Sequence, residues 1–399
     1  MKHMSRFSSC TALPDDPIFG MAALFEADPR PHKVNLGIGS YKDQNGSPLV
    51  LQSVREAEAR LEHQQLNKEY LPIEGLDSFN AALTELVFGS TRKKNLGKRL
   101  ISMQTVGGTS ALFIAGELLA KHVTRQIYLP NLTWANHAPV FQHAHMDIAF
   151  YPYADLNKQL FDFEAMCHSI EQMPKGSAIL LHVNCHNPTG IDPHKEQWRQ
   201  LSTLIRKRAI FPLFDLAYQG FGGTPQEDVY PLHLFAEEGY EMCVAVSCAK
   251  NFGLYGERVG MLALICQTAD ISRNVNSYLK QSVRSSYSNP PLQGSRIVST
   301  ILHDSHLTQI WLKELASMRE RIQAMRIELA TKLNRGNYLI EQRGMFSCLG
   351  LNEAQISFLR DKYAVYLVEN GRLNIAGLNA RNIDHVADAL RTSLHTSIG

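Results

Sequence analysis

Short runs of hydrophobic residues alternate with segments of helical periodicity along most of the chain. Four runs, at 178–183, 210–214, 242–246 and 260–265, are almost entirely apolar. Runs of this kind are typical of strands that are buried on both faces of a parallel sheet. The segment 196–208 instead repeats its apolar residues at helical spacing. The alternation predicts an α/β fold in which helices flank a mostly parallel sheet.

A stretch of helical character at 300–333 predicts one or two long helices that lead into a C-terminal domain. At 399 residues, the chain is long enough for two domains. We therefore expect an N-terminal arm that also contributes to a small domain (1–46), a large domain (47–315) and a C-terminal small domain (316–399).

Composition narrows the class of protein. Hydrophobic residues make up 44% of the chain and charged residues 20%, as in ordinary globular proteins. The net charge of +2 argues against nucleic acid or a membrane surface as a partner attracted by bulk charge. The seven cysteines are scattered without a CxxC pair, which favours reduced thiols in the cytoplasm. We expect no signal peptide, and no apolar run approaches the roughly 20 residues of a membrane span.

The segment 247–258 follows a buried strand and carries the most informative chemistry. Lys250 stands just past the strand, where partial loss of hydration lowers the pKa of an amine and makes its neutral form available as a nucleophile. Such a lysine can form a Schiff base with an aldehyde cofactor. Arg258 follows eight residues later and offers the fork of donors that suits a phosphate. On its own, a lysine in a loop is most often exposed surface.

Two other strand ends carry polar residues. Asp215 ends a buried strand at the edge where open α/β sheets bind ligands. A carboxylate buried there needs a partner, and a protonated pyridine nitrogen is a suitable one. Asn187 precedes Pro188, which keeps it out of helical geometry and directs its amide toward the cleft. His182 and His186 share no helical face, so we expect no metal site there.

A glycine-rich turn that includes Gly108 and Thr109 leads from a strand into an apolar segment of helical periodicity at 111–123. The free amide groups and the dipole of a helix that begins there favour a bound phosphate. The turn matches neither GxGxxG nor a Walker loop, so a nucleotide is not indicated.

The segment 247–258 as a whole resembles the lysine motif of class I pyridoxal-phosphate aminotransferases, in their aspartate and aromatic branch. Other motifs of that family follow in the family's order over nearly the whole chain. The resemblance implies the type I fold of pyridoxal-phosphate-dependent transferases, with a mostly parallel seven-stranded sheet in the large domain and a smaller α/β domain. It also implies a homodimer with shared active sites.

The resemblance gives each motif residue a role toward pyridoxal phosphate. Lys250 would hold the cofactor as an internal aldimine, with Asp215 at the ring nitrogen. Tyr218 and Asn187 would contact the phenolic oxygen, Trp134 would stack on the ring, and His137 would lie behind Asp215. The phosphate would be bound by Gly108, Thr109, Ser247 and Arg258, and by Tyr70 of the neighbouring subunit.

Substrate contacts are implied in the same way. Ile38 and Gly39 would lie in a segment that closes over the substrate, beside Trp134 and Asn187. Arg372 would bind the α-carboxylate, and Arg284 of the neighbouring subunit would bind the distal carboxylate of a dicarboxylic substrate. Cys348 departs from the family, which commonly has an aromatic residue near the pocket there, so the width of the side-chain pocket stays open.

The implied reaction is a ping-pong transamination between an L-amino acid, aspartate or aromatic, and 2-oxoglutarate. Lys250, Asp215 and Tyr218 would be its catalytic residues, with Lys250 as the general base. One alternative is a pyridoxal-phosphate lyase or decarboxylase on the same fold, which would not need Arg284. Another is a cofactor-binding regulator without turnover, although no residues are left over for the DNA-binding extension that such a protein usually carries.

Overall fold

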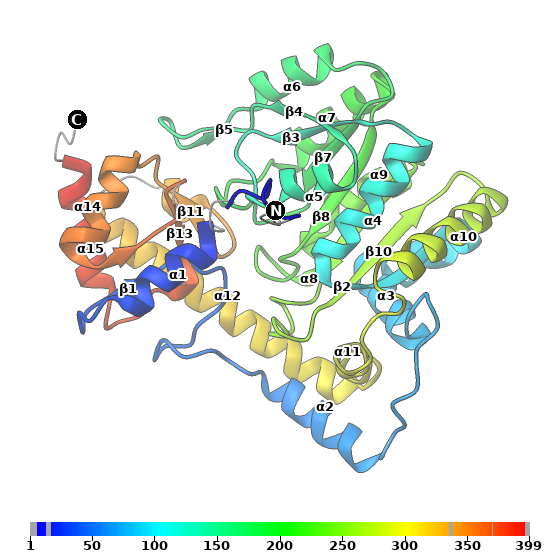
Figure 1. The fold of residues 1–399 in the computed structure, drawn as a ribbon, viewed down its shortest axis with the longest axis horizontal. Helices are drawn as coiled ribbons and strands as arrows, with labels where there is room; N and C mark the ends of the chain where they lie inside the picture. The colour runs from blue at the N-terminus through cyan, green and yellow to red at the C-terminus, as the bar shows by residue number, and fades with distance from the viewer. Residues whose placement is uncertain (1–5, 13–16, 335–337, 369, 396–399) are drawn as a thin grey trace, which may run out of the picture.

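A seven-stranded sheet forms the centre of the larger part of the molecule (Figure 1). The computed structural model describes residues 6–12, 17–334, 338–368 and 370–395. In spatial order the strands are β2 (Leu100–Val106), β10 (Val259–Ile265), β9 (Met242–Ser247), β8 (Phe211–Leu216), β7 (Ala178–His182), β3 (Gln126–Pro130) and β4 (Asp147–Tyr151). In this sheet β10 runs antiparallel to both neighbours and the other pairs are parallel, which confirms the predicted mostly parallel sheet.

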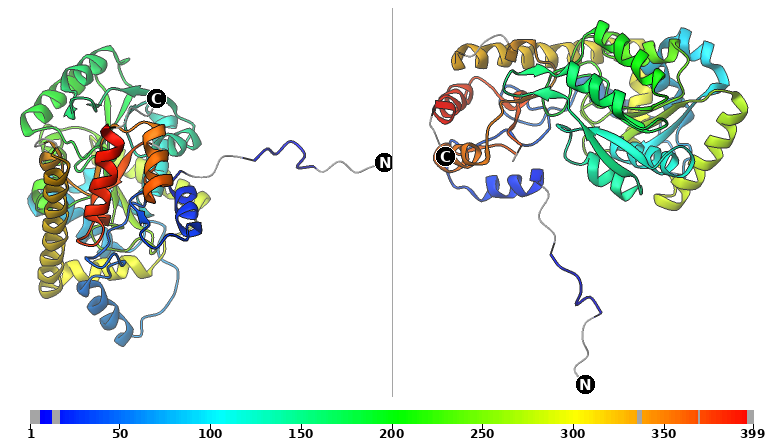
Figure 2. Two further views of the ribbon diagram at one scale, coloured as in Figure 1. Left: turned by 90° about the vertical axis from the view of Figure 1, so that its left-hand side faces the viewer. Right: turned by 90° about the horizontal axis from the view of Figure 1, so that it is seen from above.

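Helices cover both faces of this sheet (Figures 1 and 2). The helices of this larger part are α2 (Gln52–His63), α3 (Asp77–Leu96), α4 (Gly107–His122), α5 (His137–His143), α6 (Phe163–Gln172), α7 (Lys195–Lys207), α8 (Pro225–Asp228), α9 (Tyr230–Glu237), α10 (Ala269–Ser286) and α11 (Gln293–His303), with the 3-10 helix η1 (Gly97–Arg99). In β9, Val244 and Val246 pack into the core that contains α3 and α7, whereas Cys243 and Ala245 pack into the core that contains α4 and α10. Because both faces of the strand are buried, its sequence is apolar throughout instead of alternating.

A smaller group of elements lies at the other end of the molecule (Figure 1). It consists of α1 (Pro17–Ala27), β1 (Val34–Asn35), α13 (Tyr338–Glu341), β11 (Phe346–Cys348), α14 (Glu353–Tyr363), β12 (Val365–Tyr366), β13 (Arg372–Asn374), the 3-10 helix η2 (Ile375–Gly377) and α15 (Ile383–His395). Strand β1 pairs with β12, so residues near the N-terminus join the C-terminal part of the chain. Strand β11 pairs with β13. A hairpin of β5 (Ala154–Asp155) and β6 (Leu160–Phe161) extends from the larger part.

Helix α12 (Ser305–Leu333) has 29 residues and connects the two parts of the molecule (Figure 1). It contacts α2 and α11 on the side of the large sheet, and α13 and α15 in the smaller group. The domain boundary that we expect at 315/316 falls inside this helix. Near the start of the helix, the fully buried ring of Trp311 stacks on Phe252 with 4.7 Å between ring centroids, and its Nε1–H donates to the carbonyl oxygen of Asn251 at 2.7 Å. The helix is thereby fixed to the segment 247–258.

Residues 6–12 lie well away from the rest of the described chain (Figure 2). All seven cysteines of the sequence fall within the described residues and are free thiols. Within the described ranges, no helix combines the length and the apolar character that crossing a bilayer requires.

We expect Trp311→Ala to lower the free energy of unfolding by about 3–5 kcal/mol, because it leaves a cavity in a fully buried site. Trp311→Phe should cost less, since it keeps a ring against Phe252 and loses a hydrogen bond worth about 1 kcal/mol. Urea denaturation followed by far-UV circular dichroism measures both. Equal midpoints for Trp311→Ala and the wild type would contradict the role given to this contact.

Candidate active site

The carboxyl ends of β7, β8 and β9 meet at one edge of the sheet, where the loops that leave them carry most of the predicted site residues. His182 and Asp215 are neighbours across β7 and β8, and Asp215 is paired with Ala245 of β9. Lys250 lies three residues beyond the end of β9. Helix α4 begins at Gly107, directly after β2, at this same edge. The order of the strands therefore brings distant motifs into one cleft.

Lys250 has the electrostatic character of a reactive amine. Its Nζ lies 5.2 Å from the centroid of the Tyr218 ring. Burial lowers the pKa of Lys250 from 10.5 to about 8, against an opposing effect of the negative charge of Asp215. The positive charges of Arg258 and Arg372 lower this pKa further. In the described part of the chain, no carboxylate lies within ion-pair distance of Lys250, so the amine stays available for chemistry.

Asp215 is a buried carboxylate held from behind by an imidazole. It is 9% exposed, and its Oδ2 lies 3.1 Å from Nε2 of His137. Burial acts to raise the pKa of Asp215, but the hydrogen bond and charge of His137 outweigh it and hold the pKa below its ordinary value. The ring of Trp134 meets the His137 ring edge-on, with 5.2 Å between centroids. Asp215 is therefore an ionised acceptor that can face a cationic ring nitrogen.

A hydroxyl extends this network behind His137. Oγ1 of Thr133 lies 2.7 Å from Nδ1 of His137 and 3.1 Å from Nε2 of His182. Burial lowers the pKa of His182 to about 3, so this second imidazole is neutral. The ring of His137 is thus fixed through both of its nitrogens, and it fixes Asp215 in turn.

Arg372 reaches the cleft from β13. It is 4% exposed, its Nη1 donates to Oδ1 of Asn187 at 3.2 Å, and its Nη2 donates to the carbonyl oxygen of Gly37 at 2.6 Å. Nδ2 of Asn187 lies 3.4 Å from the hydroxyl of Tyr218, and burial raises the pKa of that hydroxyl. Within the described residues, Arg372 has no carboxylate at ion-pair distance, and its Nε has no hydrogen-bond partner. A buried guanidinium in this state is suited to an anionic ligand.

A cradle of small residues lies at the start of α4. Gly107 has φ +75°, and a Cβ there would lie 2.6 Å from Nη2 of Arg258. A Cβ on Gly108 would lie 3.1 Å from the Cβ of Ser247, a tight approach, so glycine at both positions lets the start of the helix come close to Arg258 and Ser247. Thr109, also in the first turn of α4, and Arg258 line one pocket beside this turn. Free amide groups at a helix start, a hydroxyl and a guanidinium are the donors that a phosphate needs.

The predicted closing segment lies over Arg372. Nδ2 of Asn374 donates to the carbonyl oxygens of Ile38 at 2.7 Å and of Ser40 at 2.9 Å, which fixes the backbone of this segment. A Cβ on Gly39 would lie 3.1 Å from the ring of Phe346 and 3.9 Å from Nη2 of Arg372. Glycine at position 39 therefore lets the backbone approach both groups closely.

Tyr70 and Arg284 lie apart from these residues. The side chain of Tyr70 is 83% exposed. Arg284 is also exposed, and its Nη1 donates to the hydroxyl of Ser288. Among the described residues of one chain, no hydrogen bond, ion pair or ring contact joins either side chain to Lys250.

Several residues of the site were missed in the sequence. Phe346 provides the ring over the guanidinium of Arg372, with 4.3 Å from Cζ of the arginine to the ring centroid. Cys348, two residues later, is the position that we considered for the width of the side-chain pocket. Its buried thiol donates to the carbonyl oxygen of Asn370 at 3.3 Å. Thr133 lies inside the tryptophan motif, and His182 was considered only as a metal ligand. The signal for Thr133 and His182 was their position next to a strand end, where polar residues gather.

The residues of this cleft fit a phosphate-bearing aromatic aldehyde. Lys250 offers the amine that an aldehyde needs, Asp215 offers a charge for a protonated ring nitrogen, and the cradle at 107–109 accepts a phosphate. The glycines leave the required space, and Arg372 remains for a second anion.

Comparisons with known proteins agree with this chemistry. The sequence profile of the family described as aminotransferase class I and II matches residues 31–390. A protein named cytoplasmic aspartate aminotransferase from Oryza sativa subsp. japonica is 41% identical over 403 residues, which cover 99% of both chains. Aspartate aminotransferase 1 from Medicago sativa is 42% identical over 395 residues, which cover 97% of this chain and 94% of that protein.

A solved structure extends the likeness to the fold. The crystal structure of an aromatic-amino-acid aminotransferase from Burkholderia pseudomallei, covalently bound to pyridoxal phosphate, matches with a TM-score of 0.95 and 38% sequence identity. The match covers 98% of this chain and 100% of that one. The profile match over most of the chain, the full-length relatives and the shared fold show that this chain belongs to the class I and II aminotransferases.

Proposed function

We propose that this chain is an aspartate and aromatic amino-acid aminotransferase, which moves the amino group of an L-amino acid to 2-oxoglutarate with pyridoxal phosphate as its cofactor. The relatives named above support the reaction and the cofactor. One observation carries the assignment to particular residues. The three charges that act on the pKa of Lys250 are Asp215, Arg258 and Arg372, the groups suited to the ring nitrogen, the phosphate and the substrate carboxylate.

Pyridoxal phosphate, when bound, supplies an aldehyde that links to amines and a protonated ring that withdraws electrons from the α-carbon of the substrate. Asp215 would keep the ring nitrogen protonated, because an ionised carboxylate fixed by His137 stabilises a positive charge facing it. The other contacts that we propose are Asn187 and Tyr218 at the phenolic oxygen, Trp134 at the face of the ring, and Gly108, Thr109, Ser247 and Arg258 at the phosphate.

Lys250 would move the proton. Its Nζ would accept the α-proton of the substrate and later return a proton, as a general base and then a general acid. A pKa of about 8 suits both tasks near neutral pH, because a sizeable fraction of the amine is neutral and its ammonium form still gives up a proton readily. Burial is the main cause of this value, so exclusion of water from the cleft is part of the function.

Two arginines would select the substrate. Arg372 would bind the α-carboxylate that all amino acids share, since its buried fork has no carboxylate partner among the described residues. Arg284 would bind the distal carboxylate of a dicarboxylic substrate. Ile38 and Gly39 would close over the bound substrate from the side of Arg372.

Completion of the site would need a second copy of the chain. We propose a homodimer in which Tyr70 of one subunit reaches the phosphate in the other, and Arg284 reaches the substrate in the same way. The exposure of both side chains supports this arrangement. We also propose that the protein works in the cytoplasm, as the name of the rice relative and the free thiols suggest. The lyase and regulator alternatives gain no support, because each relative described above is named an aminotransferase.

Lys250→Ala should reduce transamination between aspartate and 2-oxoglutarate by at least about 10²–10⁴-fold, the typical contribution of a general base alone. Coupled detection of the oxo-acid product measures the rate. Lys195→Ala is a matched control, because the Nζ of Lys195 also lies over a tyrosine ring, at 5.3 Å from that of Tyr230, but outside the cleft. Wild-type turnover of Lys250→Ala would remove the central residue of the proposal.

The lowered pKa of Lys250 predicts a pH dependence in the protein freed of cofactor. Only the neutral amine reacts with an amine-specific reagent, so labelling of Lys250 should rise with pH and be half-maximal near pH 8 instead of 10.5. Asp215→Asn should move this midpoint to lower pH, because it removes the negative charge that favours the ammonium form. Mass spectrometry of the peptide that contains Lys250 measures the labelling. A midpoint at the ordinary lysine value, or an upward shift in Asp215→Asn, would contradict the assigned environment.

Arg372→Ala should raise the KM of aspartate, tyrosine and phenylalanine alike, by roughly 10- to 150-fold, since one charge-assisted hydrogen bond is worth about 1.5–3 kcal/mol. Arg284→Ala should impair aspartate far more than tyrosine or phenylalanine, because the aromatic substrates have no distal carboxylate. The kcat/KM of each amino acid separates the two effects, because in a ping-pong reaction it reports the half-reaction of that amino acid and not that of 2-oxoglutarate, which is itself dicarboxylic. Equal losses for all substrates in Arg284→Ala would exclude Arg284 from the role of distal carboxylate ligand.

A further inference from the structure

The segment 342–348 of the smaller group of elements lies directly against a catalytic loop of the large sheet. The backbone N–H of Arg343 donates to the carbonyl oxygen of Gly190 at 2.7 Å. A Cβ on Gly344, which has φ +76°, would lie only 2.4 Å from the Cβ of Cys185. The loop between Cys185 and Gly190 contains Asn187, the partner of Arg372. The two parts of the molecule are thus in close contact next to the substrate site.

A single side chain joins three elements at this contact. Gln342 is 3% exposed, and its Oε1 accepts from the hydroxyl of Ser347 at 2.5 Å and from Nη1 of Arg326 at 3.2 Å. Its Nε2 donates to Oε1 of Gln159 at 3.3 Å. Ser347 belongs to β11, Arg326 to α12, and Gln159 to the turn between β5 and β6. The amide of Gln342 therefore ties the hairpin of the large part to the strand that carries Phe346.

Arg326 continues the connection into the strand. Its Nη2 donates to the carbonyl oxygens of Gly344 at 2.7 Å and Phe346 at 3.1 Å. The side chain is fully buried, and none of the described carboxylates lies at ion-pair distance from it. A buried charge of this kind depends on neutral oxygens for its stabilisation, and Oε1 of Gln342 is one of the three it has. Loss of this oxygen would weaken the anchoring of β11.

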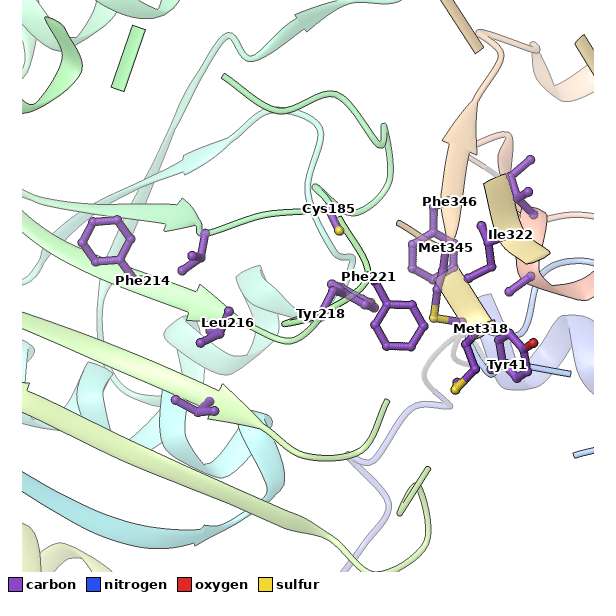
Figure 3. Packing of buried hydrophobic residues seen from close by; sticks show 14 of the residues in the cluster. Tyr41, Cys185, Phe214, Leu216, Tyr218, Phe221, Met318, Ile322, Met345 and Phe346 are labelled. Carbon is purple, nitrogen blue, oxygen red and sulfur yellow. The ribbon is translucent and has the colours of Figure 1, made fainter. Parts of the chain in front are cut away.

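The ring of Phe346 transmits the position of β11 to the substrate site. Figure 3 shows Phe346 and Met345 facing Cys185, Tyr218 and Phe221 across the contact. The Phe346 ring meets the Tyr218 ring edge-on at 5.8 Å and lies under the guanidinium of Arg372 at 4.3 Å. A cation over an aromatic face is held by the ring, so a shift of the ring displaces the cation.

We propose that Gln342 is a positioning residue for the carboxylate site of the substrate, acting through β11 and Phe346 on Arg372. The proposal rests on the function given above to Arg372. Gln342 touches neither Lys250 nor the phosphate cradle. Its effect falls mainly on Arg372, because the guanidinium lies 4.3 Å from the Phe346 ring, whereas the Tyr218 ring meets Phe346 only edge-on at 5.8 Å.

Gln342→Ala in the holoenzyme should raise the KM of both aspartate and phenylalanine roughly 3- to 10-fold, the size expected for loss of one to two hydrogen bonds. The kcat and the absorbance spectrum of the bound cofactor should stay close to wild type. A variant that was merely less well folded would lose active sites and lower kcat at unchanged KM. That outcome, or a wild-type KM for both substrates, would overturn the proposal.

Variants of Gln159 test the same connection from the other side and do not disturb the interior of β11. Gln159→Ala should raise KM as well, and the double variant with Gln342→Ala should add little to the effect of Gln342→Ala alone, because both remove one shared interaction. Full additivity of the two alanine variants would overturn the proposed connection.

Gln323→Ala is the matched control. Gln323 lies on α12, as Arg326 does, and donates its Nε2–H to the carbonyl oxygen of Ile340 at 2.9 Å, but among the described residues no hydrogen bond joins its side chain to β11. Gln323→Ala should leave KM unchanged, and a KM rise equal to that of Gln342→Ala would overturn the specific role of Gln342.

Arg372→Ala, measured in parallel, distinguishes failure of the proposed carboxylate site from failure of the role given to Gln342. If Arg372→Ala left KM unchanged, the proposed carboxylate site would fail and this inference with it; if only the Gln342 and Gln159 variants were silent, the inference alone would fail.

Discussion

Partial removal of one amine from water is the constraint on which the rest of the site depends. Lys250 lies just after β9, at the carboxyl edge of a sheet that is buried on both faces. In this position the ammonium form of Lys250 loses part of its hydration. The cost is limited by the negative charge of Asp215, which is itself stable in the interior because His137 donates to it. The lysine, the carboxylate and the imidazole therefore form one electrostatic unit, and a change in any of them alters the other two.

The fold places this unit through strand order instead of sequence proximity. His182, Asp215 and Ala245 lie side by side although about 30 residues separate each from the next in the chain. Each strand end contributes one loop, and each loop contributes one or two polar groups. The elements of the smaller group add Arg372 from the other side, held by contacts to Asn187 and Gly37. Under the proposed function, a substrate carboxylate and a cofactor would meet where the two parts of the molecule, which share one hydrophobic cluster, touch.

Much of this arrangement could be predicted from the sequence. The four apolar runs correspond to β7, β8, β9 and β10, because strands buried on both faces cannot carry polar side chains without partners. Lys250, Asp215 and Asn187 were predicted as site residues because each follows a buried strand within a long motif. Phe346 and Gln342 were not predicted, because an aromatic ring or an amide in an apolar segment looks like an ordinary core residue until its neighbours are known. Tyr70 and Arg284 differ again, as the contacts expected for them need a second copy of the chain.

The length of α12 has a mechanical consequence. Its start is fixed by Trp311 against the lysine segment, and Arg326 lies 15 residues further along, or about 22 Å at 1.5 Å per residue. A tilt of only about 5° around the fixed end would carry Arg326 sideways by about 2 Å over that length. Any rotation of the helix at Trp311, which packs beside the segment of the reactive amine, would therefore be magnified at Arg326 and β11.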